Sequence, residues 1–108
     1  MLIDTTHEAI TKLSRILPKA FVFVIDTTDR TFLFKSSEHA ECQAMILRLD
    51  QDMGIDRIVK DQGYAIKSFH SQEVGLRSLG TNTYVGYCLD HTKAEFHSLS
   101  LAQKVVID

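Results

Sequence analysis

The chain has 108 residues, of which 44% are hydrophobic and 24% are charged, and it contains a single proline. This composition is typical of a globular protein and excludes a disordered or low-complexity chain. The 12 Lys and Arg residues and the 14 Asp and Glu residues give a formal net charge of −2, which provides no general field for binding nucleic acid. We therefore expect one α+β domain over residues 1–108, without a nucleic-acid partner.

The amino-terminal residues predict a helix over residues 5–17. Thr5 and Glu8 have the spacing of a capping box, in which each side chain binds a free backbone amide of the first turn. Apolar residues then recur at helical spacing on one face. Pro18 ends the helix, because it disfavours helical geometry at the residue before it.

Residues 21–34 predict a β-hairpin around which the rest of the chain is arranged. Residues 21–25 are β-branched or aromatic without interruption, which predicts a central strand with both faces covered. Polar residues 26–30 separate this run from a second apolar run at residues 31–34. Because the polar segment contains no glycine, a loop of about four or five residues is favoured over a tight two-residue turn.

A second helix is predicted over residues 37–53, with Ser36 or Ser37 as its cap. Apolar side chains recur every three or four positions along one face. They are Cys42, Met45, Ile46, Leu49 and Met53. Gly54 predicts a left-handed end to the helix. We expect this helix and the first one to cover the same face of an antiparallel sheet.

The middle of the chain contains one ambiguous segment. Ile55, Ile58 and Val59 fit one face of a helix that ends at Gly63, whereas residues 57–60 are also short enough to form a strand. Residues 64–69 and 83–89 predict two further strands. Between them, residues 71–79 indicate a short helix, although Gly75 weakens that interpretation by about 1 kcal/mol relative to alanine.

Residues 92–107 leave two alternatives open. They fit one amphipathic helix, or two strands at residues 94–101 and 104–107. A helix would cover the remaining sheet face or pair with a second copy of the chain, since symmetric pairing is the commonest form of oligomer. The second possibility predicts a homodimer. Its interface residues would be Phe96, Leu99, Val105 and Val106.

The elements predicted over residues 17–37 resemble the opening of a PAS domain. Such sensory modules often begin with a helix, an apolar strand that ends on Asp, a short turn, a second apolar strand and a capped helix. Here Asp26 ends the first apolar run, and residues 31–34 form the second. The same order opens roadblock and other profilin-like domains. The resemblance implies that the domain senses a ligand or dimerises through an antiparallel sheet. It does not identify any residue of this chain as a binding residue.

Cys42 and Cys88 are the two cysteines of the chain, and they lack the dense spacing of disulfide-rich secreted domains. Reduced thiols are therefore expected. Acidic residues stand where a signal peptide would need basic and apolar ones, and no apolar run approaches the length of a membrane span. We expect a cytoplasmic protein without a membrane partner.

Cys88, Asp90, His91 and His97 gather side chains that suit zinc. Their spacing lacks the two close ligand pairs that structural zinc sites usually show. Cys88 and His91 could also form a catalytic thiolate–imidazole pair, but no orienting group or oxyanion donor accompanies them. We therefore expect no metal, no cofactor and no catalytic residue. The alternatives are a metal site at Cys88, His91 and His97, and catalysis by Cys88 with His91.

These patterns predict a non-enzymatic regulatory or interaction module that binds a small apolar ligand or a partner protein as a homodimer. One alternative is a mobile-element inhibitor or immunity-type protein that acts by surface complementarity. Another is a small Cys/His enzyme. A cavity between the sheet and the helices would favour a ligand-binding module, and a solid core would favour binding between protein surfaces.

Overall fold

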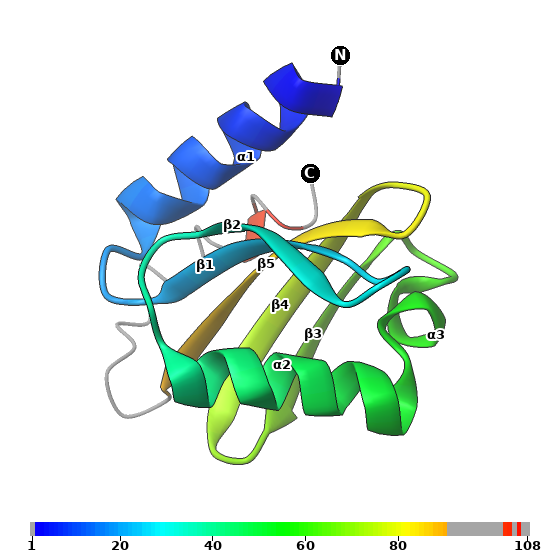
Figure 1. Cartoon of the computed structure of the whole chain (residues 1–108). Coiled ribbons are helices and arrows are strands. Elements are labelled where there is room, and N and C mark those ends of the chain that lie inside the picture. Colours follow the sequence, from blue (N-terminus) through cyan, green and yellow to red (C-terminus); the bar gives the residue numbers. More distant parts are fainter. Residues whose placement is uncertain (1, 91–102, 105, 107–108) are drawn as a thin grey trace.

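The computed structural model describes residues 2–90, 103, 104 and 106 (Figure 1). Its elements are α1 (Leu2–Ile16), β1 (Phe21–Asp26), β2 (Thr31–Lys35), α2 (Ala40–Met53), α3 (Ile55–Val59), β3 (Tyr64–Phe69), β4 (Gln72–Gly80) and β5 (Thr83–Asp90). The strands form one antiparallel sheet in the order β2-β1-β5-β4-β3. The predicted α+β class is therefore confirmed. In the described part of the chain, no helix has the length and apolar character needed to cross a bilayer.

Strand β1 lies inside the sheet, as its uninterrupted apolar sequence predicts. It pairs with β2 on one side and with β5 on the other, so that Val24 is opposite both Phe34 and Val85. All of its residues from Phe21 to Ile25 are buried. The second arm of the hairpin, β2, is an edge strand of this sheet, and β5 occupies its middle.

Helices α1 and α2 cover opposite faces of the sheet (Figure 1). Phe21, Phe23 and Ile25 pack in one buried cluster with the inner face of α2 and with α3. Val22 and Val24 pack in a second cluster with α1. The expectation that both helices cover one face is therefore wrong. Since successive side chains of a strand point to opposite faces, a strand that is apolar at every position needs cover on both sides.

In the predicted apolar stripe of α2, Cys42, Ile46 and Leu49 are buried, whereas Met53 at the end of the helix is exposed. The helix begins later than the sequence indicates. Its cap is His39, whose Nδ1 accepts a hydrogen bond of 3.2 Å from the backbone N–H of Cys42. Ser36 instead accepts a hydrogen bond of 2.9 Å from the backbone N–H of Val22. The predicted serine cap is therefore wrong, because Ser36 is used to join the end of β2 to β1.

The carboxy-terminal ends of α1 and α2 lie close to the positions that the sequence predicts. Gly54 ends α2 with φ of 81°, in the left-handed region, and its N–H donates to the carbonyl groups of Leu49 and Asp50. The ambiguous segment that follows forms the short helix α3. Helix α1 begins at Leu2 rather than at residue 5, and it ends at Ile16.

Residues 72–80 form strand β4 where the sequence indicated a helix. A two-residue loop precedes it, in which His70 and Ser71 have φ of 49° and 66°. Positive φ at both central residues is the geometry of a type I′ turn, which matches the twist of a hairpin. The prediction failed because this turn lacks the usual Asn-Gly sequence that marks a hairpin. Gly75, which weakened the helix interpretation, lies in the strand against the ring of Tyr87.

In the carboxy-terminal segment, Gln103, Lys104 and Val106 are helical. The Val106 side chain is fully buried among the residues that α1 covers. This position is therefore covered by its own chain and is not an exposed part of a dimer interface. The other predicted interface residues, Phe96, Leu99 and Val105, lie outside the described residues.

Candidate functional site

Edge strand β2 exposes two adjacent large apolar side chains, which we call the β2 patch: Leu33, 61% exposed, and Phe34, 36% exposed. The strand pairing shifts between Val24–Phe34 and Ile25–Phe32. Leu33 is therefore the extra residue of a β-bulge and has no partner in β1. Sequence analysis predicted the second apolar run at residues 31–34 but not its place at the edge, because an apolar run does not reveal which arm of a hairpin lies there.

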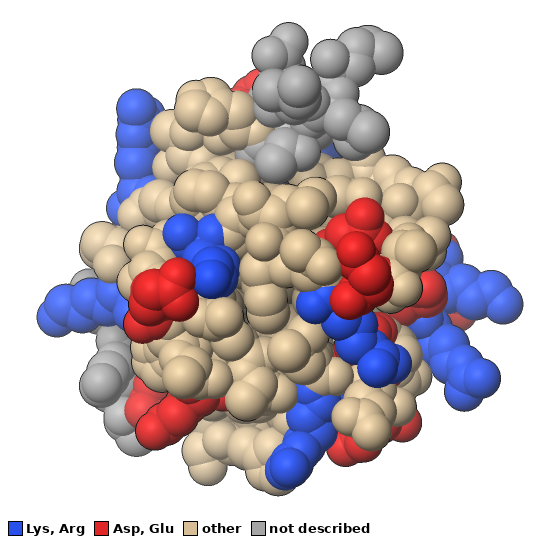
Figure 2. Space-filling view, in the orientation of Figure 1, with Lys and Arg blue, Asp and Glu red and all other residues tan. Residues whose placement is uncertain are grey.

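Ion pairs flank the β2 patch. At one end Lys35 Nζ lies 2.9 Å from Glu38 Oε1, and at the other Arg30 Nε lies 2.8 Å from Asp50 Oδ2. On the face shown in Figure 2, uncharged atoms occupy the middle, and charges of both signs are scattered around them. That face carries no concentrated region of positive charge. An apolar patch with a polar rim is the usual form of a protein-binding surface.

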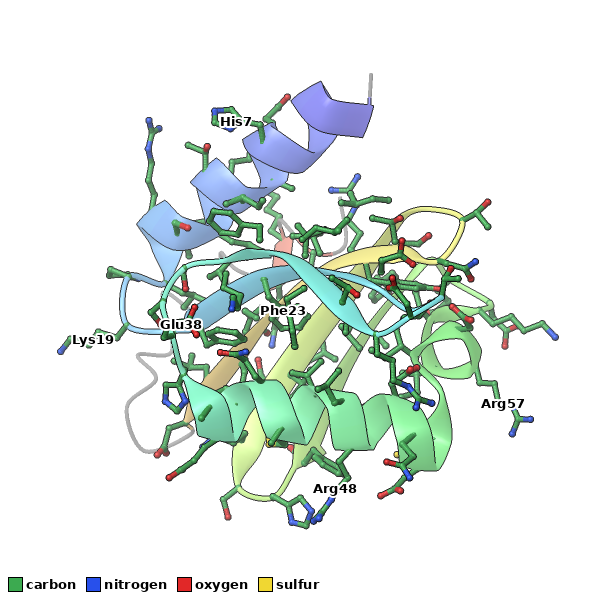
Figure 3. The ribbon with its side chains drawn as sticks, viewed as in Figure 1. His7, Lys19, Phe23, Glu38, Arg48 and Arg57 are labelled. Carbon is green, nitrogen blue, oxygen red and sulfur yellow. The ribbon has the colours of Figure 1, made fainter. Side chains whose placement is uncertain are left out.

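A surface hollow of about 400 Å³ lies where the first turns of α2 approach the β3–β4 turn. Its lining includes His39, Glu41, Met45, Arg48, His70 and Gln72. Arg48 extends from α2 on the side away from the sheet (Figure 3). Because most of its lining side chains are exposed, the hollow differs from the enclosed apolar cavity that a small apolar ligand would require.

A smaller hollow of about 180 Å³ shares part of this lining. It lies between the first turn of α2 and the end of β5, and both Cys42 and Cys88 contribute to its wall. Further along the inner face of α2, Phe23, Ile46 and Leu49 pack together and are fully buried. The hollows therefore lie at one end of a solid core.

Cys88, the predicted alternative nucleophile, is buried on β5 and is only 2% exposed. Its thiol donates a hydrogen bond of 3.4 Å to Gln72 Oε1. Burial raises the pKa of this thiol well above its ordinary value, whereas a nucleophilic cysteine needs a lowered pKa. The described environment of Cys88 is therefore that of a protonated core thiol.

Of the remaining predicted ligands around Cys88, Asp90 alone lies within the described residues. Asp90 ends β5, and His91 and His97 lie outside the described residues. Over residues 2–90, 103, 104 and 106, no group of three or more His, Cys, Asp or Glu side chains is arranged to hold a metal ion.

Cys42 and Cys88 lie in contact with each other, an arrangement that sequence analysis missed. Their thiols are close enough to interact as a hydrogen-bonded pair. Both cysteines are free and buried, in the cluster between α2 and the sheet. The sequence indicated only that each cysteine lies on the inner face of its helix or strand. It could not indicate that the two lie near each other, because residues far apart along the chain form no local pattern.

No protein-family model matches this chain, and a search of curated proteins finds no match to it. The features that can guide a functional proposal are therefore the β2 patch, the two hollows and the contact between Cys42 and Cys88.

Proposed function

We propose that the protein is a non-enzymatic interaction module that binds a protein partner through the β2 patch. The observation that carries this proposal is the exposure of Leu33 and Phe34, two consecutive large apolar residues of an edge strand. Exposed apolar side chains that occur singly need no explanation, but adjacent ones inside a charged rim indicate a surface that becomes covered. The exposure of most side chains that line the hollow beside α2 favours a protein partner over a small apolar ligand, which needs an enclosed cavity.

The partner that we propose is a second copy of the chain. A two-fold axis through the β2 patch would bring the same apolar side chains together from both copies, as in the commonest oligomers. The contact would involve side chains rather than a continuous sheet, because the bulge at Leu33 interrupts the regular spacing that a new strand needs.

We also propose that the protein belongs to the class of sensory domains that residues 17–37 resemble. The order α1, β1, β2, α2 and the antiparallel sheet support a PAS-like or profilin-like module, for which the resemblance implies dimerisation or ligand sensing. A cytoplasmic location also belongs to the proposal. It is supported by the two free thiols, since the cytosol keeps cysteines reduced.

Sedimentation velocity of the full chain tests the proposal. We expect a dimer at micromolar concentration for the unmodified protein, and a folded monomer for Leu33→Glu, because two like charges would face each other across the axis. Met53→Glu is the matched control: Met53 is also apolar and 40% exposed, but it lies at the end of α2. This variant should remain a dimer.

Two results would contradict the proposal: a monomeric unmodified protein, or a Leu33→Glu variant that dimerises unchanged. The interface predicted at Phe96, Leu99 and Val105 stays a separate prediction. A Phe96→Glu variant in the same measurement distinguishes the two surfaces, since only one of the two substitutions should separate the copies.

A further inference from the structure

The contact between Cys42 and Cys88 joins two elements that are distant in sequence. Cys42 lies in the first turn of α2, and Cys88 lies on β5, the middle strand of the sheet. Both side chains belong to the α2-facing core, and each thiol affects the pKa of the other. A disulfide requires two sulfur atoms that already lie close together, because larger separations cost backbone movement. The two cysteines line one small hollow and belong to one buried cluster, which brings the pair into the same region of the core.

The second requirement is access for an oxidant, and the smaller hollow provides it. This hollow has a volume of about 180 Å³, and its wall includes both cysteines together with Lys19 and Gln72. Cys42 also lines the larger hollow and is 7% exposed, whereas Cys88 lines only the smaller one. Cys42 is therefore the thiol that an incoming reagent meets first.

We propose that Cys42 and Cys88 form a reversible disulfide on exposure to a small-molecule disulfide, so that the pair is a redox modification site. This inference is independent of the β2 patch. Cys42 supplies the attacking thiol and Cys88 the resolving thiol. The raised pKa of both buried thiols keeps the reaction slow at neutral pH, because only the thiolate attacks.

The exchange proceeds in two steps. Cys42 loses its proton, and its sulfur attacks one sulfur of the small disulfide, which breaks the S–S bond and releases one small thiol. The Cys88 sulfur, after losing its proton, then attacks Cys42 Sγ in the mixed disulfide and releases the second small thiol. Two protein thiols are oxidised, one small disulfide is reduced, and the two protons leave with the released thiols.

The new bond would tie the first turn of α2 to the centre of the sheet. In the reduced protein this turn is held by packing and by the cap from His39 to the N–H of Cys42. A covalent link that closes the long chain segment between Cys42 and Cys88 restricts the unfolded state more than the folded one. Oxidation should therefore raise the melting temperature and fix the shape of the shared hollow wall.

The test is incubation of the folded full chain with oxidised glutathione, followed by acid quenching and intact-mass measurement. We expect the protein to lose two hydrogen atoms without retaining glutathione, to keep its oligomeric state, and to melt at a higher temperature. Dithiothreitol should reverse all these changes. Failure of the thiols to oxidise under conditions that oxidise a model dithiol would overturn the proposal, as would disulfide links between copies.

Single substitutions test the order of attack. Cys88→Ser should accumulate one glutathione on Cys42, because no resolving thiol remains. Cys42→Ser should stay unmodified over the same time. The reverse pattern, or equal modification of both variants, would overturn the roles assigned to the two cysteines. Circular dichroism confirms that each variant is folded, and the result for the unmodified protein decides whether the disulfide forms.

Discussion

Gly75 on β4 lies directly beneath the ring of Tyr87 on β5. A Cβ atom at residue 75 would come within 2.2 Å of that ring. The Tyr87 hydroxyl in turn donates a hydrogen bond to Glu73, which is the one charged residue that is buried in the described part of the chain. The glycine therefore makes room for an aromatic ring whose hydroxyl satisfies a buried carboxylate.

Gly75→Ala should lower the free energy of unfolding by about 3 kcal/mol or more, because the methyl group must displace a fully buried ring. Urea denaturation measures the change. Gly63→Ala is the control: it has open space around its Cβ but a φ of 78°, so strain alone should cost about 1 to 2 kcal/mol. Equal losses for the two variants would show that the Tyr87 ring can move aside.

At the scale of single elements, α2 depends on an unusual cap. His39 accepts the N–H of Cys42 through Nδ1, a role that Ser, Thr, Asp or Asn more often fills. A cap of this kind requires that Nδ1 carry no proton, since a protonated nitrogen cannot accept a hydrogen bond. The cap of helix α2 therefore requires the His39 tautomer whose ring proton is on Nε2.

His39→Ala should destabilise the protein by about 1 kcal/mol, since it leaves a first-turn amide without its acceptor. His39→Asn should preserve the stability, because its side-chain oxygen can replace Nδ1. Ser37→Ala is the matched control. Ser37 was predicted as a cap from the sequence, but it lies outside the helix and is exposed, so its loss should change stability little. Chemical denaturation of the three variants checks this ranking.

The elements that could be predicted from the sequence are those with a complete local pattern. The hairpin and the stripe of α2 repeat their apolar side chains at regular spacing, and Gly54 marks a helix end. Strand β4 could not be predicted, because a glycine is needed at position 75 to make room for the ring of Tyr87, which lies on another strand. The contact of Cys42 with Cys88 was equally hidden, since it depends on which face of the sheet α2 covers.

The whole molecule buries several groups that must stay protonated. Burial, the largest cause, raises the pKa of both thiols and of the Tyr84 and Tyr87 hydroxyls. The carboxylates of Asp56 and Glu73, which accept from the two tyrosines, raise these pKa values further. Each of these groups is neutral in the folded protein over a pH range in which the unfolded chain ionises.

Stability should therefore be lost on the alkaline side. Unfolded thiols ionise near about pH 8.5 and unfolded tyrosines near about pH 10. Above these values the unfolded chain binds fewer protons than the folded one, so that the free energy of unfolding falls as pH rises. Urea midpoints measured with reductant from neutral to alkaline pH check this. A Cys42→Ala, Cys88→Ala double variant should begin its decline later, and an identical profile would contradict the role of the thiols.

Because β1 pairs with β5, which lies much later in the chain, the sheet around β1 cannot form completely until late in synthesis. During synthesis on a ribosome, β1 leaves the tunnel long before the residues from Thr83 to Asp90 that pair with it. Until then β1 has only β2 as a neighbour, and the side chains from Phe21 to Ile25 lack half of their cover. Non-local pairing of this kind is slow to form, and its unpaired strands are open to aggregation. The nascent chain is therefore most prone to aggregation while the ribosome translates the segment between β1 and β5. This period ends only when β5, the middle strand of the sheet, has left the ribosome.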